Sequence, residues 1–279
     1  MDRRFQIVDV FADAPFAGNP VAVVLDGEGL TTAEMLSITQ WMNLSETTFL
    51  LPPTSAEADY RARIFTLERE MPFAGHPTLG SCRAWLTDQA ARRTNTVVQE
   101  CGIGLVPIAI DAEHLAFAAP APLRDGPASD ADVEQVCDFL GLRREDVVDC
   151  AWVDNGPGWI GVLMRSAEDV LGVNAPGSYD SSMDVGLIGP YPAGGPAQFE
   201  VRALFSDHHG AIREDPVTGS LNASMAQWML ASKRATAPFV NQQGQRVGRA
   251  GRIRITQDPG GAVWVAGRAQ TLVSGTLAA

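Results

Sequence analysis

The stretch "MPFAGHPTLGSCRAWL" (residues 71–86) places a histidine between a glycine and a proline, just where a helical pattern begins. A second stretch, "DPVTGS" (215–220), repeats the order of "HPTLGS" (76–81): an ionisable residue, proline, two further residues, glycine and serine. The two copies lie about half a chain apart, which suggests an internal repeat. We therefore expect two halves, each with a helix that starts at this motif.

Each motif is expected to begin its helix at the proline, because proline suits the first helical position. His76 and Asp215 would then lie at two helix N-termini, where free N–H groups and aligned peptide dipoles favour anions. Two such ends predict a site for a carboxylate. The dipole also favours the neutral form of His76, which can accept a proton. The alternative is that Asp215 is an ordinary N-cap and that His76 fills the equivalent place.

A third ionisable residue lies in "MNLSETTFLL" (42–51), where Ser45 and Glu46 interrupt an apolar stretch directly before a strand. Apolar surroundings would raise the pKa of the Glu46 carboxyl towards the working range of a general acid or base. The alternative is an exposed glutamate at a strand end. In "FAGNPVAVV" (16–24), Asn19 lies in a turn that could present its amide to a ligand.

Composition restricts the class of protein. The chain has 279 residues, 46% of them hydrophobic, so it can bury a real core. Its net charge of −12 opposes binding to nucleic acids and to anionic membrane surfaces. The four cysteines show no CxxC spacing and there is no secretory or membrane-spanning pattern, so we expect reduced thiols and a cytoplasmic protein. The four histidines are not spaced for a helical metal site and no phosphate-binding loop is present, so we expect no metal.

Short runs rich in valine, isoleucine and phenylalanine alternate with glycine and proline along the chain, so strands should dominate. Helices are expected at 31–43, after His76, at 129–141 and after Asp215. The segment "APAPLRDGPASD" (119–130) is the best candidate for a linker. We expect an N-terminal half over 1–119 and a C-terminal half over 129–279, with the last strand free to return to the first half.

Four motifs, "VDVFADAPFAGNPVAVV", "NLSETTFL", "PFAGHPTLGS" and "REDPVTGS", follow one another across almost the whole chain. Together they resemble the PhzF family of phenazine-biosynthesis isomerases. The resemblance implies an α+β fold like that of diaminopimelate epimerase, in which two similar halves each wrap a β-barrel-like sheet around a central helix. It places the active site in the cleft between the halves. It implies that Glu46 is the catalytic proton shuttle, that His76 and Asp215 assist it, and that ligand contacts come from Asn19, Ser45, Gly75, Gly219 and Ser220.

The predicted activity is that of a cofactor-independent isomerase. Glu46 would remove a C–H proton from a small unsaturated carboxylic acid and return it elsewhere on the molecule, while the helix N-termini hold the carboxylate and the developing charge. One alternative is a non-catalytic small-molecule-binding or metabolic accessory protein that keeps the cleft. Another is epimerase- or racemase-type proton transfer on an amino-acid-like substrate, although two-cysteine racemases of this fold carry thiols where this chain has His76 and Asp215. The resemblance also implies a homodimer.

Two segments depart from the family pattern. Leu67 in "RIFTLERE" takes the place of a frequent proline, and "FSDHHGAIR" (205–213) replaces a proline-containing turn. His208 and His209 in the second segment either alter the substrate pocket or, as adjacent loop residues, face solvent.

Overall fold

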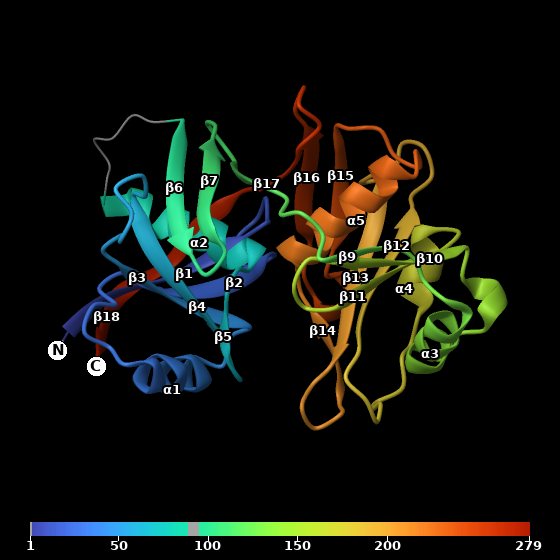
Figure 1. The fold of residues 1–279 in the computed structure, drawn as a ribbon, viewed down its shortest axis with the longest axis horizontal. Coiled ribbons are helices and arrows are strands. Elements are labelled where there is room, and N and C mark those ends of the chain that lie inside the picture. The colour runs from blue at the N-terminus through green and yellow to red at the C-terminus, as the bar shows by residue number, and fades with distance from the viewer. Residues whose placement is uncertain (1, 89–94) are drawn as a thin grey trace. The chain divides into compact units, whose positions relative to one another are not determined.

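The computed structural model describes residues 2–88 and 95–279. In it, the runs rich in valine, isoleucine and phenylalanine form strands, as predicted. Their branched and aromatic side chains pack well on a pleated surface. Internal contacts divide the chain into two units, Met1–Ala118 with Ala266–Ala279 and Ala119–Val265. Figure 1 shows the strands and the few helices of each unit, and the predicted α+β class is confirmed.

Within residues 2–88, 95–118 and 266–279, the first unit holds the first eight strands, two helices and the last strand of the chain. Its elements are β1 (Asp2–Val10), β2 (Asn19–Val24), α1 (Thr32–Met42), β3 (Glu46–Leu51), β4 (Tyr60–Thr66), β5 (Glu70–Met71), α2 (Gly75–Asp88), β6 (Thr96–Cys101), β7 (Gly104–Ile110), β8 (Leu115–Ala118) and β18 (Ala269–Ala278).

The second unit holds the remaining strands, three α-helices and two short 3₁₀ turns, and the end of its last strand crosses into the first unit. Its elements are β9 (Arg124–Pro127), α3 (Asp130–Leu140), η1 (Arg144–Asp146), β10 (Asp149–Asp154), β11 (Trp159–Leu163), α4 (Ala167–Gly172), β12 (Asp184–Pro190), β13 (Phe199–Ser206), β14 (Ile212–Asp215), α5 (Gly219–Ala231), β15 (Phe239–Gln243), η2 (Gln245–Val247), β16 (Gly251–Gln257) and β17 (Val263–Gly267).

The two units share one order of strand pairing. In the first, β1 and β2 are antiparallel, β3 runs parallel to β2 after α1, β4 and β5 follow antiparallel, and β6 runs parallel to β4 after α2. In the second, β10 to β15 repeat this order with α4 and α5 as the connecting helices. The six-residue echo in the sequence therefore belongs to a repeat of the whole supersecondary pattern.

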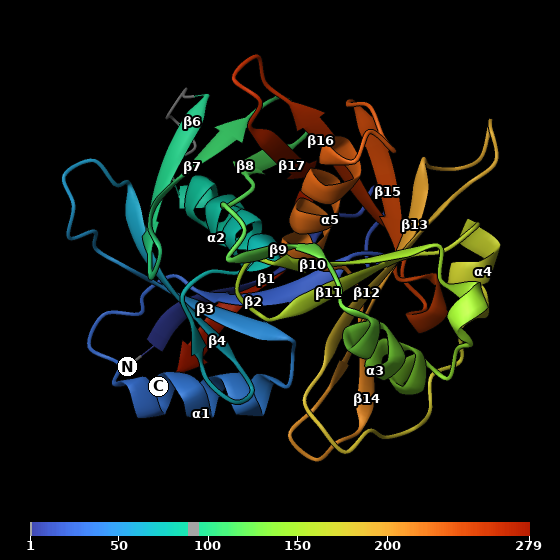
Figure 2. The same ribbon diagram turned by 45° about the vertical axis from the view of Figure 1, so that its right-hand side comes forward.

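Each unit packs strands around one helix. In Figure 2, α2 lies among the strands of the first unit, and it contacts β1, β2, β3 and β8 among others. Gly80 allows this close packing, because a Cβ atom there would lie 2.2 Å from Val21 Cγ1 of β2. In the second unit the small residue is on the strand instead: a Cβ atom on Gly186 of β12 would lie 2.4 Å from Leu221 Cδ1 of α5.

Outer helices cover other faces of the strands. Met35 of α1 packs with Val24, Phe49 and Phe65 in the first unit. In the second unit, α3 and α4 contribute to a buried cluster with β11 and β12. No helix within residues 2–88 and 95–279 is long and apolar enough to cross a membrane.

The predicted helix starts are wrong at both motifs. Helix α2 begins at Gly75, two residues before Pro77, because the Thr78 N–H already bonds the Ala74 carbonyl. Helix α5 begins only at Gly219, because strand β14 extends as far as Asp215 through its pairing with β13. The segment expected to be a linker also contains a strand, since β9 pairs antiparallel with β10.

Candidate active site

Glu46 opens strand β3, just after the turn that follows α1. The helix ends at Met42 and is capped by Asn43, whose left-handed backbone angle (φ 54°) asparagine tolerates better than most residues. After Ser45 the chain enters β3, where Glu46 lies between Val21 of parallel β2 and Thr66 of antiparallel β4. The Glu46 side chain is 17% exposed. The strand therefore holds this carboxyl group at a partly buried position.

The imidazole of His76 lies between Glu46 and Asn19. His76 is the second residue of α2 and is buried. Its Nε2 atom lies 3.3 Å from Glu46 Oε2, and its Nδ1 atom lies 3.4 Å from Asn19 Nδ2. The starts of β2, β3 and α2 thus bring together three of the residues that the sequence singles out.

The surroundings of His76 determine its charge and its tautomer. Burial lowers the pKa of His76 to about 3, so the ring is neutral near pH 7. The Asn19 amide nitrogen can only donate, so Nδ1 is the accepting nitrogen of the ring. The ring proton is therefore assigned to Nε2, which faces Glu46.

The first turn of α2 adds backbone donors near this cluster. Gly75 and His76 carry N–H groups ahead of the first helical bond, from Thr78 N–H to the Ala74 carbonyl, and Pro77 carries none. N-terminal N–H groups and the helix dipole favour an anion at this end. Gly75 is the first residue of this turn, and its contact with a ligand stays a prediction.

Asp215 belongs to the second unit and ends strand β14, opposite Ala203 of β13. The N-cap of α5 is Thr218, and its hydroxyl makes no capping bond to the helix. Instead, Thr218 Oγ1 donates a hydrogen bond to Asp215 Oδ2 at 2.6 Å. The alternative in which Asp215 is an ordinary N-cap is therefore wrong.

Gly219 and Ser220 are the first two residues of α5, so their N–H groups belong to its N-terminal end. The Ser220 carbonyl accepts a hydrogen bond from Asn155 Nδ2 at 2.8 Å. Asn155 lies in the turn between β10 and β11. Asparagine before glycine in "DNGPGW" (154–159) signals the turn, but no local pattern in the sequence reveals a contact with a helix 65 residues further on.

His208, His209 and Cys82 bear on the pocket and racemase alternatives. His208 and His209 are exposed in the turn between β13 and β14, with ring centroids 3.8 Å apart, as expected for loop residues. Within the described ranges, no three His, Cys, Asp or Glu side chains form a group that could hold a metal. Cys82 lies inside α2, and burial raises its pKa to about 12. Its thiol stays protonated, which disfavours the two-thiol racemase alternative.

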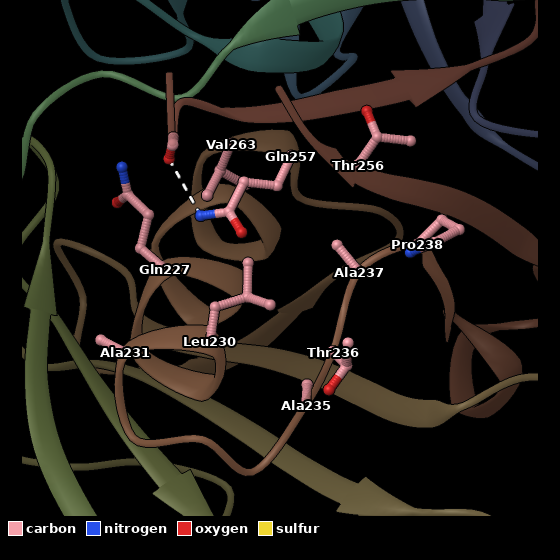
Figure 3. A pocket seen from close by; sticks show the side chains of 11 residues that line it. Gln227, Leu230, Ala231, Ala235, Thr236, Ala237, Pro238, Thr256, Gln257 and Val263 are labelled. Carbon is pink, nitrogen blue, oxygen red and sulfur yellow. Dashed lines mark hydrogen bonds between the residues drawn. The ribbon is translucent and has the colours of Figure 1, made fainter. Parts of the chain in front are cut away.

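A cavity of about 670 Å³ in the second unit has none of these residues in its lining. Figure 3 shows its lining, which comes from the end of α5, the loop before β15 and the β16–β17 hairpin, where Gln257 Nε2 donates to the Gly261 carbonyl at 3.0 Å. Its lining side chains are apolar or neutral amides and hydroxyls. Because none of them titrates near neutral pH, this cavity is not suited to acid–base chemistry.

Comparison with known proteins adds the family. The PhzC-PhzF family model, described as phenazine biosynthesis-like protein, matches residues 8–275. The chain is 34% identical to antisense-enhancing sequence 1 of Schizosaccharomyces pombe, with 98% of each chain covered. It is 29% identical to trans-2,3-dihydro-3-hydroxyanthranilate isomerase of Pseudomonas aeruginosa, again with 98% of each chain covered.

The fold has a close match among solved structures. The PhzF-family phenazine biosynthesis protein of Bacillus anthracis superimposes over 100% of both chains, with a TM-score of 0.82 and 22% sequence identity. The PhzF-like α+β fold that the four motifs imply is therefore confirmed.

Proposed function

Because the chain belongs to the phenazine biosynthesis-like (PhzC-PhzF) family and is a PhzF-like isomerase, we propose that it moves a proton within a small unsaturated carboxylic acid. Glu46 is the group that carries the proton. The observation that supports this role is the 3.3 Å approach of the neutral His76 ring to the Glu46 carboxyl. The substrate class follows from the relatives and from the anion-favouring start of α2.

The proposed reaction needs one base that later acts as an acid. The Glu46 carboxylate takes a proton from an acidic C–H group, and the electron pair of that bond moves into the adjacent unsaturated system. Backbone N–H groups of Gly75 and His76 stabilise the substrate carboxylate and the charge that develops. Glu46, now neutral, returns the proton to another carbon of the same molecule. Asp215 is kept as the second acid–base group, in the assisting role that the family resemblance implies.

The test uses trans-2,3-dihydro-3-hydroxyanthranilate, the substrate named for the Pseudomonas aeruginosa relative, as the first probe. The protein is incubated with it in D₂O and the carbon-bound hydrogens are followed by NMR. We expect solvent deuterium to enter at carbon during turnover, at the same rate after exhaustive dialysis against EDTA. Binding of this probe, or of other small unsaturated carboxylic acids, without deuterium at carbon would contradict the proposal and favour a non-catalytic binder.

We also propose that the protein works in the cytoplasm as a homodimer. The resemblance to the PhzF family supports both the dimer and the compartment. Light scattering at micromolar concentration should give about twice the single-chain mass of 29.8 kDa. A mass near that of one chain would contradict the dimer, and a membrane-bound fraction after cell lysis would contradict the compartment.

A further inference from the structure

A chain of buried polar side chains lies beneath the start of α5 and ends on Asp215. Gln243 of β15 and Asn222 of α5 are fully buried, and Thr218 is 8% exposed. Gln243 Nε2 donates to Thr218 Oγ1 at 2.9 Å, and Thr218 Oγ1 donates to Asp215 Oδ2 at 2.6 Å. We call Gln243, Thr218 and Asp215, with the supporting Asn222, the Asp215 relay.

The direction of every hydrogen bond in the Asp215 relay is fixed by one backbone group. The Thr218 N–H can only donate, and it bonds Gln243 Oε1 at 3.0 Å. The other end of the same amide, Nε2, must therefore face the Thr218 hydroxyl and donate to it. A hydroxyl has a single proton, so Thr218 Oγ1, which accepts from Gln243, gives its proton to Asp215.

The neighbouring groups leave Gln243 no other orientation. Its Oε1 also accepts from Asn222 Nδ2 at 2.7 Å, and its Nε2 also donates to the Asp215 backbone carbonyl at 3.2 Å. The second proton of Asn222 Nδ2 goes to the Thr218 carbonyl at 3.0 Å. Both ends of the Gln243 amide are thus fully used, and a buried amide would lose these bonds if it flipped. The neighbouring charged residue Glu214 pairs with Arg202 at 2.8 Å instead.

The first unit contains a similar glutamine–threonine hydrogen bond, but its threonine hydroxyl has a different acceptor. Gln99 of β6, the strand that follows α2, is fully buried, and its Nε2 donates to Thr78 Oγ1 at 3.0 Å. The Thr78 hydroxyl then donates to the Ala74 backbone carbonyl at 2.9 Å. In the first unit the threonine hydroxyl thus donates to a backbone carbonyl, whereas in the second unit it donates to a carboxyl group. We therefore take the glutamine–threonine pair to have a structural role in the first unit and a functional one in the second.

We propose that Gln243 and Thr218 are positioning residues that hold the Asp215 carboxyl group as an ionised acceptor in a fixed orientation. The inference rests on the proposed function for its catalytic meaning, because Asp215 is there the second acid–base group. A hydroxyl proton that points at Oδ2 favours the carboxylate over the carboxylic acid. Gln243 contributes twice, since it orients that hydroxyl and also bonds the Asp215 backbone.

The first test needs no substrate. In protein labelled with ¹³C at the aspartate carboxyl carbons, the Asp215 signal is assigned by its loss in Asp215→Asn, and its titration is followed by NMR. Thr218→Val keeps the shape but removes the hydroxyl, and Gln243→Met keeps the length but removes the amide. Each substitution should raise the titration midpoint of the Asp215 carboxyl group by about one pH unit, because the charged form loses a hydrogen-bond donor. Thr218→Ser, which keeps the hydroxyl, should leave the midpoint at its wild-type value.

A matched variant in the first unit controls for general damage. Gln99→Met removes the same kind of buried amide, so it should lower stability similarly but leave the Asp215 midpoint in place. If Thr218→Val and Gln243→Met fail to fold, the hydrogen bonds of the Asp215 relay can be tested by NMR on the wild-type protein. A Thr218 hydroxyl proton held between two partners should exchange slowly and show an NMR contact with the Gln243 amide protons. An unmoved midpoint in a folded variant, or a rapidly exchanging Thr218 hydroxyl, would overturn the relay.

The second test links the relay to turnover. With trans-2,3-dihydro-3-hydroxyanthranilate as the probe, Thr218→Val should lower kcat by about 10- to 100-fold with KM within a few-fold, because a misplaced catalytic group slows the reaction more than binding. Thr218→Ser should recover most of the rate. If the probe is not turned over but the midpoint moves, the proposed function fails and the relay stands. If the probe is turned over and Thr218→Val changes neither the Asp215 midpoint nor kcat, the proposed role of the Asp215 relay is contradicted while the proposed function stands.

Discussion

At the scale of single residues, burial keeps the His76 imidazole neutral beside the Glu46 carboxyl. The sequence predicts the neutral form from the helix dipole, whereas the structure shows burial as the dominant cause. Either cause lowers the pKa of His76 in the folded protein below its value in the unfolded chain, so the stability of the protein should depend on pH.

Glu46→Gln tests the proton carrier directly. The substitution keeps shape and hydrogen bonding but removes the basic oxygen, so a ligand should bind nearly normally while turnover falls by about 10²- to 10⁴-fold. Deuterium uptake at carbon by NMR measures the loss, and Glu57→Gln, at an exposed glutamate of the same unit, serves as the control. Turnover within a few-fold of wild type would remove Glu46 from its role and make His76 the leading candidate for the base.

The burial of His76 predicts a loss of stability in mild acid. The unfolded chain protonates this residue as the pH falls through its usual value of 6.5, whereas the folded protein resists protonation down to about pH 3. The free energy of unfolding is therefore unaffected by this residue's titration above pH 6.5, and it decreases as the pH falls below that value. At pH 5 the loss is about 2 kcal/mol. Urea unfolding of wild type and His76→Gln at pH 7 and pH 5 should show the wild type losing more by about that amount, and equal losses would contradict the neutral assignment.

At the scale of elements, the close contact between α2 and β2 depends on Gly80. A methyl group at this position would meet Val21 Cγ1, so Gly80→Ala should cost about 1–3 kcal/mol in overpacking, only partly offset by the better helix propensity of alanine. Gly172→Ala, where a Cβ atom meets nothing within 4 Å, is the matched control and should be nearly neutral. Chemical denaturation measures both.

A double variant makes the same prediction sharper. Val21→Ala should relieve the clash, so the pair Gly80→Ala and Val21→Ala should be more stable than the sum of the single changes predicts. Simple additivity would show that α2 adjusts its position without strain.

Elements with strong local signals could be predicted, and those formed by distant pairing could not. Helix α1 was expected at 31–43 and spans Thr32–Met42, where Thr31 and Glu34 form a capping box. Strand β14 has four residues and exists because it pairs with β13. That pairing delays the start of α5, and the motif alone therefore misplaced the helix N-terminus.

The same distinction holds for the candidate site. The motifs single out Glu46, His76 and Asn19, and these three side chains lie close together in the structure. Gln243 was not singled out, because its contact with Thr218 joins a strand to a helix start 25 residues earlier. The one signal in the sequence is a glutamine within the strand-like run "FVNQQ" (239–243), because a polar side chain that a strand buries needs a hydrogen-bond partner.

At the scale of the whole molecule, the first unit depends on a strand from the other end of the chain. Strand β18 pairs antiparallel along the length of β1, from Asp2 opposite Ala278 to Val10 opposite Ala269. Removal of residues 269–279 should therefore expose β1 as an edge and lower amide protection in β1 to β4. Hydrogen exchange read by mass spectrometry should show unchanged protection in β10 to β13, which serves as the internal control. Equal protection of β1 with and without β18 would contradict this dependence.

The return of β18 also sets an order of assembly during translation. The ribosome releases β1 first, yet that strand gains its second neighbour only after residues 269–278 have emerged. The second unit is built from the continuous stretch Ala119–Val265, so all of its residues are available earlier. A nascent chain is therefore expected to complete its later half before its earlier one, with the first strand synthesised waiting longest for its partner.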